Sequence, residues 1–169
     1  LTSVAEYINS KVATGPVPAS LNFTNTYSAK ETSVQFEGIK NLDGRDTELE
    51  AGEFSFELYE RESEDKNSNA TKLETVSNAK NGTFKFSEIT YYEDGADTYY
   101  YHVKEVNGGE KIDGVSHDDI IYYITVTVYD NGEGQMIADT VMTHSEQADP
   151  DVALSDTTLY FNNLYSTDD

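Results

Sequence analysis

Apolar and polar residues alternate along this chain with a period of two, and this pattern limits what the chain can fold into. Phe54, Phe56 and Leu58 alternate with more polar residues, and Phe84 and Phe86 do so further along. Successive side chains of a strand point to opposite faces, so these segments predict strands with one buried face. Helical periodicity is hard to find, and the one short helical turn considered covers residues 43–50.

Turn-forming dipeptides separate the strand-like segments. They are Asn81-Gly82, Asn131-Gly132, Asp43-Gly44, Asp94-Gly95 and Gly108-Gly109. The run at 120–129 is β-branched and aromatic throughout, which is compatible with burial on both faces. Residues 61–72 and 145–157 are polar or acidic, and we expect both to be solvated loops, the first of them mobile. Short strands with frequent turns indicate an all-β fold, an antiparallel β-sandwich.

Charge and cysteine content exclude several classes of protein. Lys and Arg together number 11 against 32 Asp and Glu, which gives a net charge of −21. This charge repels nucleic acid and anionic membrane surfaces, so we expect no nucleic-acid partner. No apolar run approaches the roughly 18 residues of a membrane helix, so we expect no membrane insertion in this segment, and we find no secretory signal. The absence of cysteine excludes disulfides, thiol catalysis and cysteine-bound zinc.

Two short segments of the chain match each other. FTNTYSA at 23–29 and FNNLYST at 161–167 share Phe, Asn, Tyr and Ser at equivalent positions. Similarity at a fixed period is typical of tandem arrays, with chance agreement as the alternative. We predict that residues 1–27 are the C-terminal strands of a preceding repeat and that residues 28–169 form a complete repeat. Residues 1–27 would then fold on the main domain, pair with another chain or fray.

Three polar residues share strand faces with aromatic or aliphatic neighbours: Lys40, Glu105 and Asn163. Burying such groups alone is costly, and alternation leaves two explanations open. Each could lie at a strand end and reach water. Alternatively, the three meet: apolar surroundings lower the pKa of the lysine and raise the pKa of the carboxyl. The neutral amine then attacks the asparagine carbonyl, the carboxyl moves protons, ammonia leaves and an isopeptide crosslink remains.

Five segments, in order, resemble the isopeptide-forming pilin repeat of Gram-positive surface proteins, the FctA and CnaB-like sandwich family. They are IKNLDGRD with AGEFSFELYE (39–46 and 51–60), NGTFKFSEITY (81–91), TYYYHVKEV (98–106), IIYYITVTVYDNGEGQMIADTV (120–141) and YFNNLYS (160–166). The last segment has Leu where the family's usual wording, close to F-x-N-T-Y, has Thr. The first strand, just before the first of these segments, carries Glu37 and Gly38 close to the lysine. Neither departure removes a reacting group.

The resemblance implies an Ig-like sandwich of CnaB type, with inverse Ig topology and a Lys–Asn isopeptide crosslink. It implies Lys40 as the nucleophile, Glu105 as the acid/base and Asn163 as the acceptor. Asn25 is the equivalent of Asn163 in the preceding repeat, and we expect it to be uncrosslinked. The crosslink would be a single autocatalytic event, so we expect no turnover enzyme and no cofactor.

The function implied is a structural stalk repeat of an adhesin or pilin on the bacterial cell surface. Neighbouring repeats of the same polypeptide are the expected partners, with a host matrix protein or glycan as a further candidate. The alternative is a ligand-binding adhesin module on the same sandwich, with a patch formed by Tyr91, Tyr92, Tyr99 and Tyr100. The carboxylates form no recognisable pair, so a glycosidase is disfavoured.

No metal site is expected from the histidines or the acidic turns. His102, His117 and His144 are scattered without metal-ligand spacing. Three acidic segments could bind calcium but lack EF-hand spacing: 94–97, 118–119 and 130–133. Three glycosylation sequons, at residues 22, 69 and 81, are read as accidental turn chemistry.

Overall fold

The computed structural model describes residues 22–167, which contain strands and loops but no helix. No helix in this part of the chain is therefore a candidate for crossing a membrane. The helical turn considered for residues 43–50 is wrong, because these residues leave a strand and continue as bends and irregular backbone. Residues 1–21 lie outside the described residues, and with them most of the segment expected to belong to a preceding repeat.

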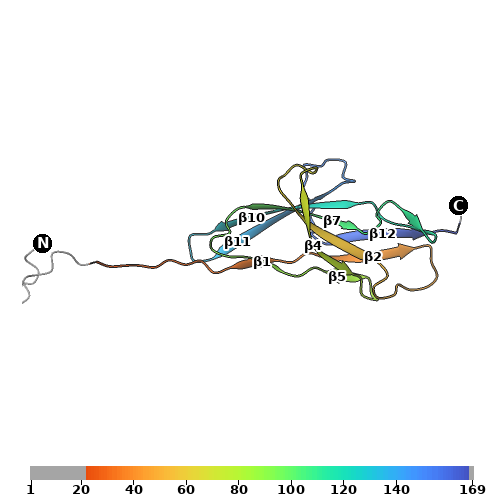
Figure 1. Ribbon diagram of the computed structural model, residues 1–169, viewed down its shortest axis with the longest axis horizontal. Coiled ribbons are helices and arrows are strands. Elements are labelled where there is room, and N and C mark those ends of the chain that lie inside the picture. The colour runs from red at the N-terminus through yellow and green to blue at the C-terminus, as the bar shows by residue number, and fades with distance from the viewer. Residues whose placement is uncertain (1–21, 168–169) are drawn as a thin grey trace, which may run out of the picture.

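The strands form two five-stranded sheets and one two-stranded ribbon (Figure 1). The first sheet has the order β11-β10-β7-β3-β4, the second β5-β2-β12-β9-β8, and the ribbon pairs β1 with β6. The strands are β1 (Thr32–Val34), β2 (Glu37–Asp43), β3 (Ser55–Arg61), β4 (Ala70–Ser77), β5 (Thr83–Lys85), β6 (Ile89–Tyr91), β7 (Thr98–Glu105), β8 (Lys111–Ile112), β9 (Val115–Ser116), β10 (Ile121–Asp130), β11 (Met136–His144) and β12 (Leu159–Tyr165). The predicted all-β sandwich is confirmed.

Strands β2 and β12 lie side by side and run parallel, whereas the other strand pairs in the described sheets are antiparallel. Lys40 stands opposite Phe161, and Leu42 stands opposite Asn163. A parallel pair needs a crossover connection, and here almost the whole domain is that connection. The first strand of the second sheet and the last strand of the domain thereby become neighbours.

Aromatic rings fill the space between the two sheets. Phe56 of the first sheet stacks on Phe84 of the second, with ring centroids 3.8 Å apart, and also contacts Phe161 at 5.0 Å. The alternation read from the sequence matches the burial of β10, where Ile124 and Val126 are fully buried. The opposite face of β10 is half-buried near its start and exposed near its end, so the strand is not buried on both faces throughout.

The polar segment expected as a loop over 61–72 is shorter than predicted, because β3 extends to Arg61 and β4 begins at Ala70. The Arg61 side chain is buried, and its Nη1 donates hydrogen bonds to the carbonyl oxygens of Ser63, Glu64 and Asp65. One guanidinium therefore ties the hairpin loop to the outer face of the first sheet. Residues 145–157 contain no strand, as predicted.

His102 lies beside Arg61 on this outer face and has an unusual environment. Its ring stacks on Tyr59 at 4.7 Å, and its Nδ1 is buried with no hydrogen-bond partner among the described residues. Burial, aided by the charges of Arg61 and Lys104, lowers the pKa of His102 to about 4. An unfolded histidine titrates near 6.5, so the unfolded chain binds more protons between these two pH values.

We predict that His102 makes the domain less stable as pH falls from about 6.5 towards 4. His102→Phe keeps an aromatic ring but cannot be protonated, so its free energy of unfolding should decline less over this range. Urea unfolding at a series of pH values measures this difference. The carboxylates titrate in both proteins, so their contribution cancels when the two are compared. Parallel curves of unfolding free energy against pH for the two proteins would contradict the prediction.

Gly38 on β2 allows the parallel pair to form. A Cβ at this position would overlap the carbonyl oxygen of Leu159 on β12 and the ring of Phe84 on β5. Since the first obstacle is backbone, it cannot move aside without disturbing the pairing of β2 with β12. The glycine that departs from the family pattern therefore has a packing reason.

We predict that Gly38→Ala lowers the free energy of unfolding by about 2 kcal/mol or more, as overpacking of a dense core does. Urea unfolding measures the change. Glu37→Ala, at the exposed neighbouring position on β2, is the matched control and should change stability little. Equal effects of the two substitutions would show that the close approach at Gly38 is unimportant.

Candidate functional site

The two sheets bring Lys40, Glu105 and Asn163 together in the interior of the sandwich. Lys40 lies on β2, Asn163 on the adjacent β12, and Glu105 ends β7 in the facing sheet. The exposed fraction of these residues is 1%, 2% and 2%, respectively. The explanation in which each reaches water at a strand end is therefore wrong. The inward faces assigned from alternation are the faces that the structure shows.

The Glu105 carboxylate connects the other two side chains. Lys40 Nζ lies 2.7 Å from Glu105 Oε2, and the side chains of this pair are fully buried. Asn163 Nδ2 donates to the other oxygen, Oε1, at 2.6 Å. One carboxylate thus contacts both the amine and the carboxamide, which places it within reach of every proton that these two groups exchange.

The orientation of the Asn163 carboxamide is fixed at both ends. Its nitrogen donates to Glu105, and its Oδ1 accepts a hydrogen bond of 2.8 Å from the backbone N–H of Asp118. A donor held against a carbonyl oxygen stabilises negative charge that develops there during attack on the carbon. The carboxamide is therefore polarised in the sense that a nucleophilic attack on Cγ requires.

Burial lowers the pKa of Lys40, because an ammonium loses its hydration in the interior of the sandwich. The hydrogen bond and the charge of Glu105 oppose this effect, as does the more distant charge of Asp118. The centroid of the Phe54 ring lies 4.8 Å from Lys40 Nζ. The ring makes the surroundings apolar, and its face can also interact favourably with a cation. The net direction favours the neutral amine, which is the nucleophilic form.

His117 is a member of this cluster that the sequence did not reveal. Its Nδ1 lies 2.9 Å from Glu105 Oε1, and its ring packs edge-on against Phe54 at 5.6 Å. The residue follows β9 in a loop, where neither strand alternation nor metal-ligand spacing applies. Its proximity to Glu105 depends on how β9 folds back against β12, which no local pattern encodes.

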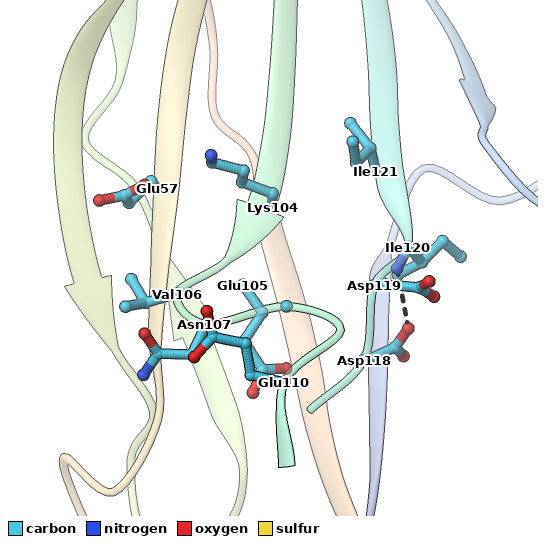
Figure 2. Close-up of a pocket in the computed structure, with 11 residues that line it drawn as sticks. Glu57, Lys104, Glu105, Val106, Asn107, Glu110, Asp118, Asp119, Ile120 and Ile121 are labelled. Carbon is cyan, nitrogen blue, oxygen red and sulfur yellow. Dashed lines mark hydrogen bonds between the residues drawn. The ribbon is translucent and has the colours of Figure 1, made fainter. Parts of the chain in front are cut away.

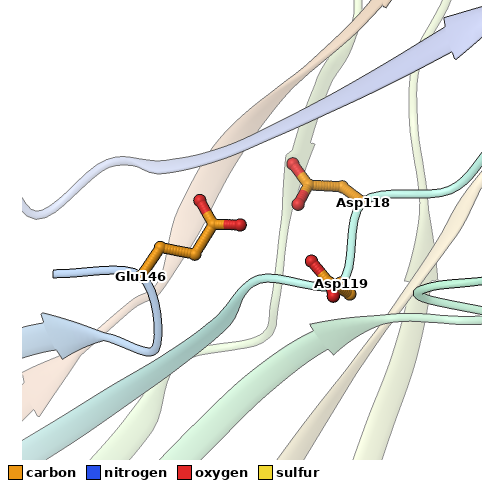
Figure 3. Close-up of side chains that lie close together, drawn as sticks. All are labelled: Asp118, Asp119 and Glu146. Atoms are coloured by element: carbon orange, nitrogen blue, oxygen red, sulfur yellow. The ribbon is translucent and has the colours of Figure 1, made fainter.

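Asp118 holds the loop that carries His117 against the closing strand. Its Oδ1 accepts from the backbone N–H of Ile120, and its Oδ2 accepts from that of Asn162. Figure 3 shows Asp118 together with Asp119 and Glu146, and one carboxylate oxygen from each of the three lies within 4.8 Å of the other two. The Asp118 carboxylate thus already receives two backbone hydrogen bonds.

A hollow of about 380 Å³ lies at the end of β7 (Figure 2). Its lining includes Lys104, Glu105 and Asn107 on one side and Asp119 and Ile121 on the other. The Glu105 side chain is fully buried, however, so its carboxylate faces the core. Lys40 and Asn163 do not line this hollow, so of the three reacting residues only Glu105 borders it.

The tyrosines considered for a binding patch differ in their surroundings. Tyr91 is buried, and its hydroxyl lies 2.7 Å from that of Tyr101. Tyr99 is half-buried and donates to the Gly95 carbonyl oxygen, whereas Tyr92 is 62% exposed. The four do not form one exposed aromatic surface, since they divide between the core and solvent.

The comparison with family models identifies the chain. Residues 36–166 match the FctA family, described as the Spy0128-like isopeptide containing domain, and the chain belongs to this family. The resemblance inferred from the five segments is therefore confirmed. The search of curated proteins found no match.

The solved structures that match the chain include the major pilin from Streptococcus pyogenes and two point mutants of it. The pilin is 18% identical, with a TM-score of 0.43, and the alignment covers 83% of this chain and 51% of that one. The mutants are 18% and 16% identical, with TM-scores of 0.40 and 0.41 and the same coverage. The chain therefore spans about half the length of the pilin structures it matches.

Proposed function

We propose that the chain is a structural stalk domain of a Gram-positive surface pilin or adhesin and that it forms a Lys40–Asn163 isopeptide bond without any other protein. The observation that carries this proposal is the buried Glu105 carboxylate in contact with both Lys40 Nζ and Asn163 Nδ2. Membership of the isopeptide domain family supports it. The stalk would lie outside the cell, where a bond without cysteine is insensitive to reduction.

The first step is a proton transfer from the Lys40 ammonium to Glu105 across their 2.7 Å hydrogen bond. It gives a neutral amine and a neutral carboxylic acid, which the apolar interior favours over two separate charges. The amine lone pair then attacks Asn163 Cγ. The negative charge that develops on Oδ1 is stabilised by the Asp118 N–H.

The second step expels ammonia. Glu105 gives its proton to Asn163 Nδ2 and then takes one from the attacking nitrogen, now positively charged. The tetrahedral intermediate collapses, the Cγ–Nδ2 bond breaks and neutral ammonia leaves. The products are a Lys40–Asn163 amide, a protonated Glu105 and ammonia, so the protons of the original ammonium and carboxamide are all accounted for. Glu105 acts in both directions, as acid and as base.

The bond would stabilise the domain by closing a long loop, from residue 40 to residue 163. Chain-entropy arguments for crosslinks give about 5 kcal/mol for a loop of this length. The crosslinked strands are also neighbours in the parallel pair β2–β12. Force that enters before β2 and leaves after β12 shears this pair, and the covalent bond would carry that force past the rest of the domain.

We further propose that residues 28–169 are one repeat of an array and that residues 1–27 belong to the preceding one. The burial of matching residues supports this division in the described part of the chain. Phe23 is 85% exposed, whereas its equivalent Phe161 is fully buried. Asn25 is exposed and Asn163 is buried. Phe23 and Asn25 therefore lie outside this core, as expected for residues that complete another domain.

We predict that the purified chain is lighter than its sequence mass by one ammonia. Intact-mass spectrometry under denaturing conditions measures this deficit. Lys40→Ala, Glu105→Ala and Asn163→Ala should each restore the full mass, because each removes one required group. Asn25→Ala is the matched control and should keep the deficit. The full mass in the unchanged chain would disprove the crosslink.

His117 is proposed as a positioning residue for Glu105. We predict that His117→Phe, which keeps a ring against Phe54, slows crosslinking several-fold, because Glu105 loses a hydrogen bond that holds its carboxylate. The chain can be synthesised in a cell-free reaction and sampled over time, with mass spectrometry giving the crosslinked fraction. Circular dichroism shows whether the variant is folded, and so distinguishes a slower reaction from a folding defect.

A further inference from the structure

The segment that leads into the domain is attached to the turn between β10 and β11. The Tyr27 hydroxyl donates to Asp130 Oδ1 at 2.7 Å and accepts from the Gly134 N–H at 2.9 Å. The hydrogen bond to Asp130 raises the pKa of Tyr27, so the phenol stays protonated and able to donate. A single hydroxyl thus contacts both sides of this turn.

Backbone hydrogen bonds continue the attachment beyond Tyr27. The Lys30 N–H donates to the Gly134 carbonyl, and the Met136 N–H donates to the Lys30 carbonyl, at 2.9 and 2.8 Å. Gln135 Nε2 adds contacts to the carbonyl oxygens of Lys30 and Glu31. These contacts form a short parallel bridge between Lys30 and Gln135, so the segment is held mainly through its backbone.

The turn is shaped to receive this segment. Gly132 and Gly134 both have positive φ, 76° and 88°, a conformation that favours glycine. Asp130 Oδ1 also accepts from the Gly132 N–H, and Asn131 Oδ1 accepts from the Glu133 N–H. The acidic turn that was considered for calcium therefore uses its side-chain oxygens to fix its own shape and to bind Tyr27.

The segment at 23–29, which matches residues 161–167, is attached to the domain only in its second half. Phe23 and Asn25 are exposed, whereas the Tyr27 hydroxyl forms hydrogen bonds with Asp130 and Gly134 of the domain. The equivalent of Tyr27 at the other end of the domain is Tyr165, which ends β12. Its hydroxyl has no hydrogen-bond partner among residues 22–167, whereas the N–H of the next residue, Ser166, donates to the Gly114 carbonyl.

We propose that the β10–β11 turn, residues 130–135, is the docking site for the end of the closing strand of the preceding repeat. In an array, Tyr165 of one repeat would supply to the next repeat the hydroxyl that Tyr27 supplies here. The partner is a second copy of this domain type in the same polypeptide. The inference rests on the proposed tandem arrangement and adds the contact that joins the repeats.

The arrangement of the ends in space agrees with this assignment. Figure 1 shows the incoming segment at the β10–β11 end of the sandwich and the end of β12 on the opposite side. Repeats joined in this way extend in a line, and each junction lies outside the sandwich cores. The junction would then have a fixed orientation, because the hydroxyl and the backbone bridge hold the connecting segment on both sides of residue 28.

The test is a fusion of two copies in which residue 165 of the first is joined to residue 28 of the second. This splice places Tyr165 where Tyr27 stands and keeps the following sequence. Residual dipolar couplings report whether the two domains share one alignment tensor. We expect one shared tensor for the fusion, and two tensors when Tyr165→Phe is made in the first copy.

The matched control is Tyr165→Phe in the second copy, where the residue is followed by no repeat. It should leave the shared tensor intact, which separates loss of the junction from damage to a domain. Two independent tensors in the unchanged fusion, or a shared tensor in the junction variant, would overturn the proposal. The intact mass of each fusion reports the crosslinks separately, with a deficit of two ammonias expected in all, so either proposal can fail alone.

Discussion

The Glu105 carboxylate, buried between two sheets, is the interaction on which the rest of the site depends. It contacts Lys40, Asn163 and His117, and it comes from the sheet opposite the first two. Leaving an unpaired charge in such a place is costly, so the lysine and the carboxylate stabilise each other only while both sheets are packed. The same low-polarity surroundings that make this pair costly also favour transfer of its proton. Folding and the proposed reaction are thereby linked, because the reacting groups meet only when the sandwich has closed.

The parallel pairing of β2 with β12 gives the proposed bond its mechanical value. Two strands from opposite ends of the domain become neighbours, and Gly38 allows their close approach. Hydrogen bonds between such strands are loaded together in shear when the ends are pulled. A covalent link between the same strands would leave the residues between 40 and 163 outside the path of force. The docking of Tyr27 on the β10–β11 turn extends this path to the neighbouring domain.

Strand alternation correctly predicted the sandwich and the inward faces of Lys40, Glu105 and Asn163, because the period of two is a local property of the backbone. The same local reasoning failed where contacts over long distances in the chain decide. The flanks of the expected loop over 61–72 are strands, since Glu60 pairs with Thr71 and Arg61 with Ala70 where β3 and β4 meet. His117 was set aside as scattered, and only the fold of the β9 segment brings it to Glu105.

The sequence by itself determined that the chain is an all-β sandwich and which polar side chains point into it, because alternation, turn dipeptides and the order of the five family segments are all written in the linear chain. The tertiary structure alone decided that those side chains meet at one carboxylate, that the Asp118 N–H faces the Asn163 carbonyl, and that the turn at 130–135 receives Tyr27. The physical reason is that hydrogen bonds between residues far apart in the chain depend on the register and packing of whole sheets. No local pattern of residue types encodes that register, so these contacts emerge only once the sheets are assembled.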